Sequence, residues 1–458
     1  MNMFSPKKFK GKKACVLGMG KSGISCARLL KRQGFDVLIS ESGIMPVPTG
    51  LEGIETETGG HSEKVFECDF AVKSPGISPR HPVLAKFKKL KKPVFSELET
   101  ACAFIPKNCK IFAITGTNGK TTTTVMLSEI MKAHCLSEKK NRKVYTVGNI
   151  GKPFSSVADS IEPGSIVVIE VSSYQLEDST YFKPYVSALL NITPDHEEHH
   201  GSFKKYIEAK GKIFKDQTSN CSFISNGANG RCVKFMKKAP CKVFAFSSTP
   251  RHSVKVDAFF DGDEMIFSDG YHIKPPKLML GIHNIENAMA ASLMAFAAKV
   301  KQKDVQTGFN TFNCPEHRIE FFCEYKGVKC YNDSKATNID STLTALKTLQ
   351  SENKIWIILG GRGKGAPYKP LLPFLNRFCK HAVLIGEDSQ NIKQQLSGRF
   401  PATEKGDLEH AVEYIFSKAQ KGDIMLLSPA CASFDQFKDF EHRGQVFKQI
   451  VKDYAKKH

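Results

Sequence analysis

Short runs of apolar, often β-branched residues alternate along the whole chain with longer segments whose apolar positions recur every three to four residues. The short runs predict strands, as at residues 13–17 and 110–115, and the longer segments predict helices. This alternation is typical of parallel sheets, because parallel neighbours need a crossover connection. At 458 residues the chain exceeds what one core supports, and we predict three domains, at residues 1–98, 99–313 and 314–458.

One stretch of the second predicted domain breaks this pattern. Between residues 241 and 277 the β-runs are short, and Asp261-Gly262 and Asp269-Gly270 separate them. Aspartate followed by glycine favours tight hairpin turns, because both residues tolerate a positive φ angle. We therefore expect a small antiparallel sheet beside a mainly parallel one.

A glycine-rich turn, Gly18-Met19-Gly20-Lys21-Ser22-Gly23, lies between the first predicted strand and a helical segment. A second predicted strand ends at Ser40 and is followed by Glu41, about 20 positions after the turn. This pattern is typical of dinucleotide-binding turns, in which a helix N-terminus binds phosphate and a carboxylate binds ribose hydroxyls. A purely structural turn explains the same glycines, so both interpretations stay open.

A second glycine loop, Gly116-Thr117-Asn118-Gly119-Lys120-Thr121, lies between a predicted strand and a helix that starts at about Lys120. Loop amides and a lysine bind phosphate oxygens, and a threonine hydroxyl binds Mg²⁺. The common P-loop has a further glycine five positions before Gly119, where Ile114 stands, so this loop is a shorter variant. Since no guanine-reading motif is visible, ATP is the expected nucleotide.

Polar residues follow the next two predicted strands. The first strand carries Glu170 in an apolar run, and a carboxylate beside a phosphate loop suits Mg²⁺. After the second strand, residues 196–200 spell the H-E-x-x-H pattern of zinc proteases. That pattern needs one continuous helix, whereas Pro194 precedes it and Gly201 follows at once. A single functional His196 in a loop is the preferred interpretation.

The net charge of +20, from 66 basic and 46 acidic residues, raises the question of an anionic partner. The lysines form short, dispersed clusters without a basic helix or interleaved aromatic residues, which favours solvated surface lysines over a nucleic-acid site. Fourteen scattered cysteines predict reduced thiols in a reducing compartment. No signal peptide and no apolar run of about 18 residues is found, so we expect a cytoplasmic protein that binds no membrane.

Twelve motifs, in this order and over nearly the whole chain, resemble those of the Mur ligases of peptidoglycan synthesis. They are GMGKSG, KSPGI, TGTNGKTT, GNIG, EVSSYQLE, NITPDH, EAK, HN with a second Asn three positions on, PEHRIE, YNDSKATN, GGRGKG and LSPACASFDQFKDFEHRG. Folylpolyglutamate synthases share the short loop but lack the N-terminal uridine-nucleotide domain. YNDSKATN and SPACASFDQF favour the family member that adds D-glutamate over its sister ligases.

The resemblance implies an α/β fold of three domains. The N-terminal domain would be Rossmann-like and bind a UDP-sugar. The central one would be a P-loop-type ATPase with a mainly parallel sheet and a small antiparallel sheet. The C-terminal one would be Rossmann-like and bind the amino acid. The implied cofactors are ATP, two Mg²⁺ ions and a carbamylated Lys210, a residue that on its own would be interpreted as a solvated helix lysine.

The resemblance also implies roles for individual residues. The catalytic residues would be Lys120, Glu170, His196 and Lys210. The metal ligands would be Thr121, Glu170, His196 and Lys210. ATP would be bound by Gly116, Thr117, Asn118, Gly119, Lys120, Thr121, Thr122, Asn284, Asn287, His317, Arg318 and Asp333. The UDP-substrate would be bound by Ser22, Glu41, Ser42, Ser74, Gly76, Asn149 and Ser172, and D-glutamate by Thr337, Lys364, Ser433, Phe434 and Phe440.

The activity implied is ATP-dependent amide-bond formation between UDP-N-acetylmuramoyl-L-alanine and D-glutamate through an acyl phosphate. The expected partners are these two small molecules, with no nucleic acid and no membrane, and the expected state is a monomer. Two alternatives stay open: another Mur ligase or a folylpolyglutamate-type ligase, and a nucleic-acid-binding NTPase that would use the positive charge.

Overall fold

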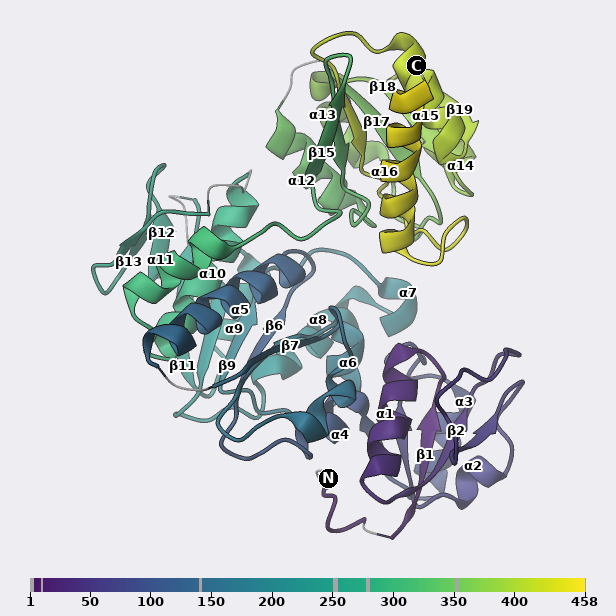
Figure 1. The fold of residues 1–458 in the computed structure, drawn as a ribbon, viewed down its shortest axis with the longest axis vertical. Coiled ribbons are helices and arrows are strands. Elements are labelled where there is room, and N and C mark those ends of the chain that lie inside the picture. The colour runs from purple at the N-terminus through teal and green to yellow at the C-terminus, as the bar shows by residue number, and fades with distance from the viewer. Residues whose placement is uncertain are drawn as a thin grey trace. The chain divides into compact units, whose positions relative to one another are not determined.

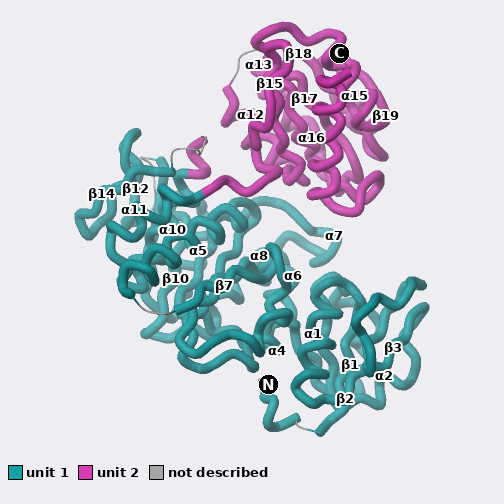
Figure 2. Tube along the Cα trace, in the orientation of Figure 1, with its two compact units in different colours: residues 1–277, 285–312 teal, residues 278–284, 313–458 magenta. Residues whose placement is uncertain are grey.

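The chain forms two compact units in the computed structural model (Figure 2), which describes residues 4–9, 11–139, 142–249, 254–276, 281–350 and 354–457. The first unit contains residues 1–277 and 285–312, and the second contains residues 278–284 and 313–458. Two of the three sheets belong to the first unit and the third belongs to the second. No helix in the described part of the chain is long and apolar enough to span a bilayer.

The N-terminal sheet of the first unit has five parallel strands in the order β3-β2-β1-β4-β5 (Figure 1). The strands are β1 Lys13–Leu17, β2 Asp36–Ser40, β3 Glu55–Glu57, β4 Phe70–Lys73 and β5 Val94–Ser96. The helices are α1 Lys21–Arg32, α2 Lys64–Glu67, α3 Pro82–Lys89 and α4 Glu97–Cys102. The buried apolar residues of β1, β2 and β4 form the core of this part.

The second sheet of the first unit has nine strands in the order β14-β13-β12-β11-β10-β9-β6-β8-β7. They are β6 Lys110–Thr115, β7 Val144–Gly148, β8 Ile166–Glu170, β9 Val186–Leu189, β10 Ser222–Asn226, β11 Lys242–Ser247, β12 Ala258–Phe260, β13 Met265–Phe267 and β14 His272–Ile273. Seven strands pair in parallel, and β13 and β14 pair in antiparallel fashion. The predicted small antiparallel sheet is therefore confirmed as an extension of the parallel one.

Helices and short 3₁₀ turns surround this sheet. They are α5 Lys120–Ser137, α6 Ser173–Asp178, α7 Glu197–His200, α8 Phe203–Gly211, α9 Gly230–Met236, α10 Ile282–Ala297 and α11 Gln302–Thr311, with 3₁₀ turns Phe154–Ser156, Ala158–Ser160 and Lys212–Phe214. Helices α5 and α11 run side by side (Figure 1) and approach closely at Gly308, where a Cβ atom would lie 2.4 Å from the Ile130 Cα. A glycine at this position is what allows the two helices to pack.

Buried carboxylates join the two sheets of the first unit. Glu97 accepts a hydrogen bond from the Ser155 amide at 2.7 Å, and Glu99 accepts one from the Thr180 hydroxyl at 2.8 Å. Burial raises the pKa of both glutamates. Lys73, which is almost fully buried, forms an ion pair with Asp178 of α6. These contacts explain why the two sheets form one compact unit.

The second unit contains a six-stranded sheet in the order β15-β16-β20-β17-β18-β19, parallel except for β15. Its strands are β15 Glu320–Tyr325, β16 Val328–Asn332, β17 Ile355–Gly360, β18 Cys379–Ile385, β19 Ala402–Gly406 and β20 Ile424–Leu427. Its helices are α12 Ile339–Leu349, α13 Leu372–Phe378, α14 Ser389–Leu396, α15 Leu408–Lys418 and α16 Phe440–Lys457, with a 3₁₀ turn Lys369–Leu371.

The predicted fold class, α/β with three mainly parallel sheets, is confirmed. All fourteen cysteines lie in the described residues and are free thiols, as predicted. Strand β9 ends at Leu189, although the apolar run of the sequence continues to Ile192. It ends early because Asn191 bonds to the glycine loop instead of a neighbouring strand. The boundaries at residues 98 and 313 remain predictions.

Candidate active site

The glycine loop after β6 is shaped by its last glycine. Gly119 has φ +84° and precedes α5, and a Cβ there would lie 2.2 Å from the Asn287 side-chain oxygen. Only glycine fits both this backbone angle and this contact. Among the described residues no side chain caps α5, so its first amide groups face the loop. A helix N-terminus of this kind is a favourable place for a phosphate.

Two lysines point at the same backbone carbonyl of this loop. The Lys120 ammonium donates to the Gly116 and Thr117 carbonyls at 2.9 and 2.8 Å, and the Lys210 ammonium donates to the Gly116 carbonyl at 2.8 Å. Lys210 is only 1% exposed. Its burial and the neighbouring charge of Lys120 lower the pKa of Lys210 well below its usual value. Lys120 thus brings a positive charge to the place where an anion would bind.

Oxygen donors gather beside the loop at the end of β8. The buried Glu170 carboxylate accepts a hydrogen bond from the Thr121 hydroxyl at 2.7 Å and one from the Asn149 amide at 3.0 Å. Glu170 and Thr121 are two of the four residues predicted to bind Mg²⁺. A carboxylate and a hydroxyl in direct contact are the hard oxygen ligands that Mg²⁺ prefers, so these residues fit the ion.

His196 lies in a loop and not on a helix. Its φ of +56° places it just before α7, which begins at Glu197. The continuous helix of a zinc protease is therefore not formed, and His196 and His200 do not share a helical face. The His196 Nδ1 atom lies 2.9 Å from the Tyr174 hydroxyl, and its Nε2 atom lies 3.5 Å from an Asp195 carboxylate oxygen.

Three residues without a predicted role contact the glycine loop or His196. Asn191 accepts from the Asn118 amide at 2.8 Å through its side chain, and its backbone carbonyl accepts from the Thr117 amide. The Tyr206 hydroxyl lies 2.8 Å from the Thr117 hydroxyl, and Tyr174 contacts His196. Asn191 follows a parallel strand, and Glu170 ends one. A polar residue at the end of a parallel strand is the sequence signal that could have identified Asn191. Tyr174 and Tyr206 have no such signal.

In the N-terminal sheet, Glu41 supports the glycine turn. Its carboxylate accepts from the Met19 amide at 2.8 Å and from the Gly43 amide at 3.1 Å. Burial raises the pKa of this carboxyl, but these hydrogen bonds outweigh burial and lower it overall. The turn is tight, since a Cβ at Gly18 would lie 2.9 Å from the Ser74 side chain.

The other residues predicted for the UDP-substrate lie in segments after strands or at the start of a helix. Ser42 donates to Glu41, Ser22 is half-buried in the first turn of α1, and a Cβ at Gly76 would meet no atom within 4 Å. Asn149 follows β7 and contacts Glu170 of the neighbouring β8. The Ser172 hydroxyl caps α6 together with Gln175. Ser22 lies in α1, and Ser42, Ser74 and Gly76 follow strands of the first sheet. Asn149 and Ser172 follow strands of the second sheet.

The second unit brings several predicted ATP and amino-acid residues together. His317 is buried, lies 2.8 Å from the Asn332 side-chain amide and packs edge-on against Phe440. Asp333 accepts from Ser428 at 2.7 Å, and burial raises its pKa to about 7. Asn284 and Arg318 belong to this unit as well, whereas the glycine loop and Asn287 belong to the first.

A buried arginine joins the remaining segments of this region. Arg443 of α16 donates to the carbonyls of Ala432, Cys431 and Ser334 and to the Ser334 hydroxyl. These bonds tie the segment that follows β16 to the one that follows β20, where the predicted Ser433 and Phe434 stand. Ser433 is buried, with no hydrogen-bond partner for its hydroxyl among the described residues, and Phe434 is 63% exposed.

The two other predicted D-glutamate residues are partly exposed. Thr337 follows the same segment after β16, and Lys364 lies in the glycine-rich loop after β17. Arg443 had no predicted role, although it stands within a quoted motif, because only the fold reveals how many carbonyls surround it.

Three family models match consecutive parts of the chain. The Mur ligase MurD-like N-terminal domain matches residues 12–96, the Mur ligase middle domain residues 114–295, and the Mur ligase glutamate ligase domain residues 317–431. Among solved structures, a pseudomurein peptide ligase type C from Methanothermus fervidus has a TM-score of 0.62 at 20% identity, over 97% of this chain and 100% of its own. That similarity concerns the fold.

Two relatives match at much higher identity. The UDP-N-acetylmuramoylalanine–D-glutamate ligase of Elusimicrobium minutum (strain Pei191) is 55% identical over 98% of this chain and 100% of its own length. The enzyme of the same name from Koribacter versatilis (strain Ellin345) is 40% identical over 97% of this chain and 98% of its own length. Because the identity extends over nearly the whole length of both, the chain belongs to the Mur ligase family.

Proposed function

We propose that this protein is an ATP-dependent ligase that adds D-glutamate to UDP-N-acetylmuramoyl-L-alanine during the synthesis of peptidoglycan precursors. The observation that carries the proposal is the 55% identity, over 98% of the chain, to a UDP-N-acetylmuramoylalanine–D-glutamate ligase. The arrangement around the glycine loop supports it, because two lysines, a carboxylate and a helix N-terminus converge there. We place the reaction in the cytoplasm and take the active form to be a monomer.

The triphosphate of ATP would bind at residues 116–122, with Lys120 turning from the loop carbonyls to phosphate oxygens. A mobile ammonium at this position neutralises charge on the transferring phosphoryl group. Thr121 and Glu170 would hold one Mg²⁺, and His196 and the carbamate of Lys210 would hold the second. Magnesium supplies charge neutralisation on the phosphates when it is bound.

The carbamate at Lys210 rests on the chemistry of a buried amine. A lysine that is 1% exposed and close to a second ammonium favours its neutral form, and the neutral amine is the form that adds carbon dioxide. The addition forms an N–C bond and releases one proton. It converts a cation into an oxygen anion, which suits a hard metal ion.

The reaction would proceed in two transfers. A carboxylate oxygen of the alanyl group attacks the γ-phosphorus, the bond to the β-phosphate oxygen breaks, and ADP leaves. The amine of D-glutamate then attacks the acyl carbon, loses a proton, and the C–O bond to phosphate breaks. Two anions must meet in the first step, so the charges of Lys120 and of the helix N-terminus are needed to offset their repulsion.

D-Glutamate would bind in the second unit, near Thr337, Lys364, Ser433, Phe434 and Phe440. Lys364 would pair with a carboxylate of the amino acid, and the buried Ser433 hydroxyl would gain a hydrogen-bond partner. Asn284, Asn287, His317, Arg318 and Asp333 would bind the adenine nucleotide. The UDP-sugar would bind at Ser22, Glu41, Ser42, Ser74, Gly76, Asn149 and Ser172.

A phosphate-release assay across amino acids tests the assignment. With ATP, Mg²⁺ and UDP-N-acetylmuramoyl-L-alanine, D-glutamate should support rapid phosphate release, while L-glutamate, L-alanine and diaminopimelate should stay near background. Stereochemical and size discrimination of this kind is set by pocket contacts and reaches factors of about 100 or more. Equal or greater release with another amino acid would assign the chain to a sister ligase, and stimulation only by DNA or RNA would favour a nucleic-acid-binding NTPase.

A further inference from the structure

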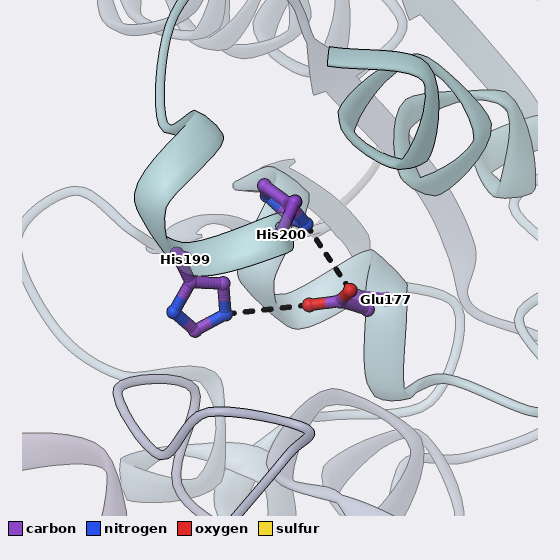
Figure 3. Close-up of side chains that lie close together, drawn as sticks. All are labelled: Glu177, His199 and His200. Carbon is purple, nitrogen blue, oxygen red and sulfur yellow. Dashed lines mark ion pairs between the residues drawn. The ribbon is translucent and has the colours of Figure 1, made fainter. Parts of the chain in front are cut away.

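Two histidines and a glutamate converge in the first unit (Figure 3). His199 and His200 end α7, and Glu177 lies on α6. The His199 Nε2 atom lies 3.3 Å from one carboxylate oxygen of Glu177, and the His200 Nδ1 atom lies 3.1 Å from the other. Neighbouring residues of a helix point in different directions, and here the carboxylate lies between the two rings. We call these three residues the Glu177 cluster.

The two contacts within the Glu177 cluster lie at ion-pair distances, but they lack the geometry of hydrogen bonds. The His199 Nε2, His200 Nδ1 and Glu177 Oε2 atoms have no bond of acceptable geometry to any described residue. The side chains are 8%, 0% and 18% exposed, respectively. Buried polar atoms without partners are uncommon in folded proteins and call for an explanation. Each residue of the Glu177 cluster contributes one such atom.

The spacing of these atoms suits a metal ion. A tetrahedral zinc ion with bonds of about 2.0–2.1 Å separates its donor atoms by about 3.3 Å. The His199 Nε2 and His200 Nδ1 atoms lie 3.3 and 3.1 Å from the two oxygens of the Glu177 carboxylate, which is close to this value. One ligand atom of each of the three residues lies within 4.8 Å of the other two. Two imidazoles and one carboxylate are ligands typical of zinc and similar divalent ions, whereas Mg²⁺ prefers oxygen ligands.

The surroundings of the cluster support ligand binding by both rings. The other nitrogen of His200, Nε2, lies 3.0 Å from the Ser173 hydroxyl, which orients the ring with Nδ1 toward the carboxylate. The His199 ring stacks on Tyr174 with centroids 3.8 Å apart. The nearby lysines are engaged elsewhere, since Lys212 donates to the backbone carbonyl of Glu177 and Lys73 pairs with Asp178.

A second group of similar composition lacks these properties. Glu316, His317 and Glu320 in the second unit also lie close together. Lys448 already pairs with both glutamates, at 3.2 and 2.8 Å, and Asn332 contacts His317 Nδ1. The Lys448 ammonium already supplies a positive charge to that group. The Glu177 cluster is therefore the stronger candidate for a metal site.

We propose that Glu177, His199 and His200 form a binding site for a divalent transition-metal ion such as Zn²⁺, distinct from the magnesium ligands of the proposed reaction. Three protein ligands leave a fourth position for water, and the Glu177 side chain is 18% exposed. Tyr174 lies between this site and the reaction site, because it stacks on His199 and contacts His196.

Cobalt titration of the metal-free protein tests this site. In excess Mg²⁺, which fills the oxygen-rich site, the wild type should bind one equivalent of Co²⁺ with visible d–d absorption and no thiolate charge-transfer band. Glu177→Gln and His199→Asn should each weaken that binding by about tenfold or more, because each change removes one of the three ligands. His410→Asn is the matched control, because His410 is an exposed histidine beside Asp407. It should bind like the wild type.

Two results would overturn the site. One is equal Co²⁺ affinity in the wild type, Glu177→Gln and His199→Asn; the other is loss of the equivalent only in His196→Asn, which would place the metal with the magnesium ligands. Circular dichroism in metal-free buffer checks that each variant folds. If His199→Asn does not fold, the same-sized Glu177→Gln decides, through a Co²⁺-dependent rise in Tm that the wild type should show and this variant should lack.

Discussion

Replacing Lys120 with alanine should reduce ATP-dependent ligation by about a thousandfold, the loss typical of removing one preorganised group that stabilises transition-state charge. The expectation follows from the position of the ammonium, within 2.9 Å of two carbonyls of the glycine loop and at the start of α5. A phosphoryl group in transfer carries its charge on oxygens that this ammonium would contact. The measurement is steady-state ADP release with both co-substrates present.

The control for Lys120→Ala lies on the same helix. Lys132 is an exposed lysine of α5 that pairs with Glu129, three residues away. Lys132→Ala should therefore retain the wild-type rate, and both variants should have similar Tm values without nucleotide. A Lys120→Ala variant that keeps more than about a tenth of the wild-type rate would contradict the role assigned to this lysine.

Lys210→Ala should lose activity by about a hundredfold or more and recover part of it when small carboxylic acids such as acetate are added. Removing the side chain leaves a buried space beside Gly116, next to the predicted metal ligands. An added carboxylate supplies the oxygen anion that the carbamate would have supplied. The measurement is the ligation rate as a function of acetate concentration.

Two comparisons make the Lys210 result specific. Lys205 is an exposed lysine on the same helix, α8, and Lys205→Ala should behave like the wild type and show no response to acetate. Rescue of Lys210→Ala by alkylamines, and not by carboxylates, would mean that the residue acts as an ammonium ion. That result would remove the carbamate from the account.

Much of the fold could be predicted from the sequence because its signals are local. Apolar periodicity identified the main strands and helices, and Asp261-Gly262 and Asp269-Gly270 identified the hairpins. The glycine loop was recognisable for the same reason, since its glycines, lysine and threonine are consecutive. The early end of β9 could not be predicted, because Asn191 bonds to a loop about seventy residues earlier in the chain.

The residues without a predicted role depend on long-range contacts. Tyr206 reaches Thr117 across 89 positions, and Arg443 reaches Ser334 across 109. The histidine pattern at residues 196–200 also shows that the sequence does not reveal long-range contacts. The sequence suggested and then rejected a zinc motif made by His196 and His200, whereas folding brings His199 and His200 to a glutamate twenty-two positions before His199. Only the fold reveals that partner.

The central claim is that the acceptor carboxylate is activated by phosphorylation, and isotope transfer tests it most directly. UDP-N-acetylmuramoyl-L-alanine labelled with ¹⁸O in its carboxylate is incubated with the enzyme, ATP, Mg²⁺ and D-glutamate, and the released phosphate is analysed by mass spectrometry. One labelled oxygen should appear in each phosphate, because the oxygen that attacks the γ-phosphorus leaves with it. Amide formation accompanied by unlabelled phosphate would contradict the account.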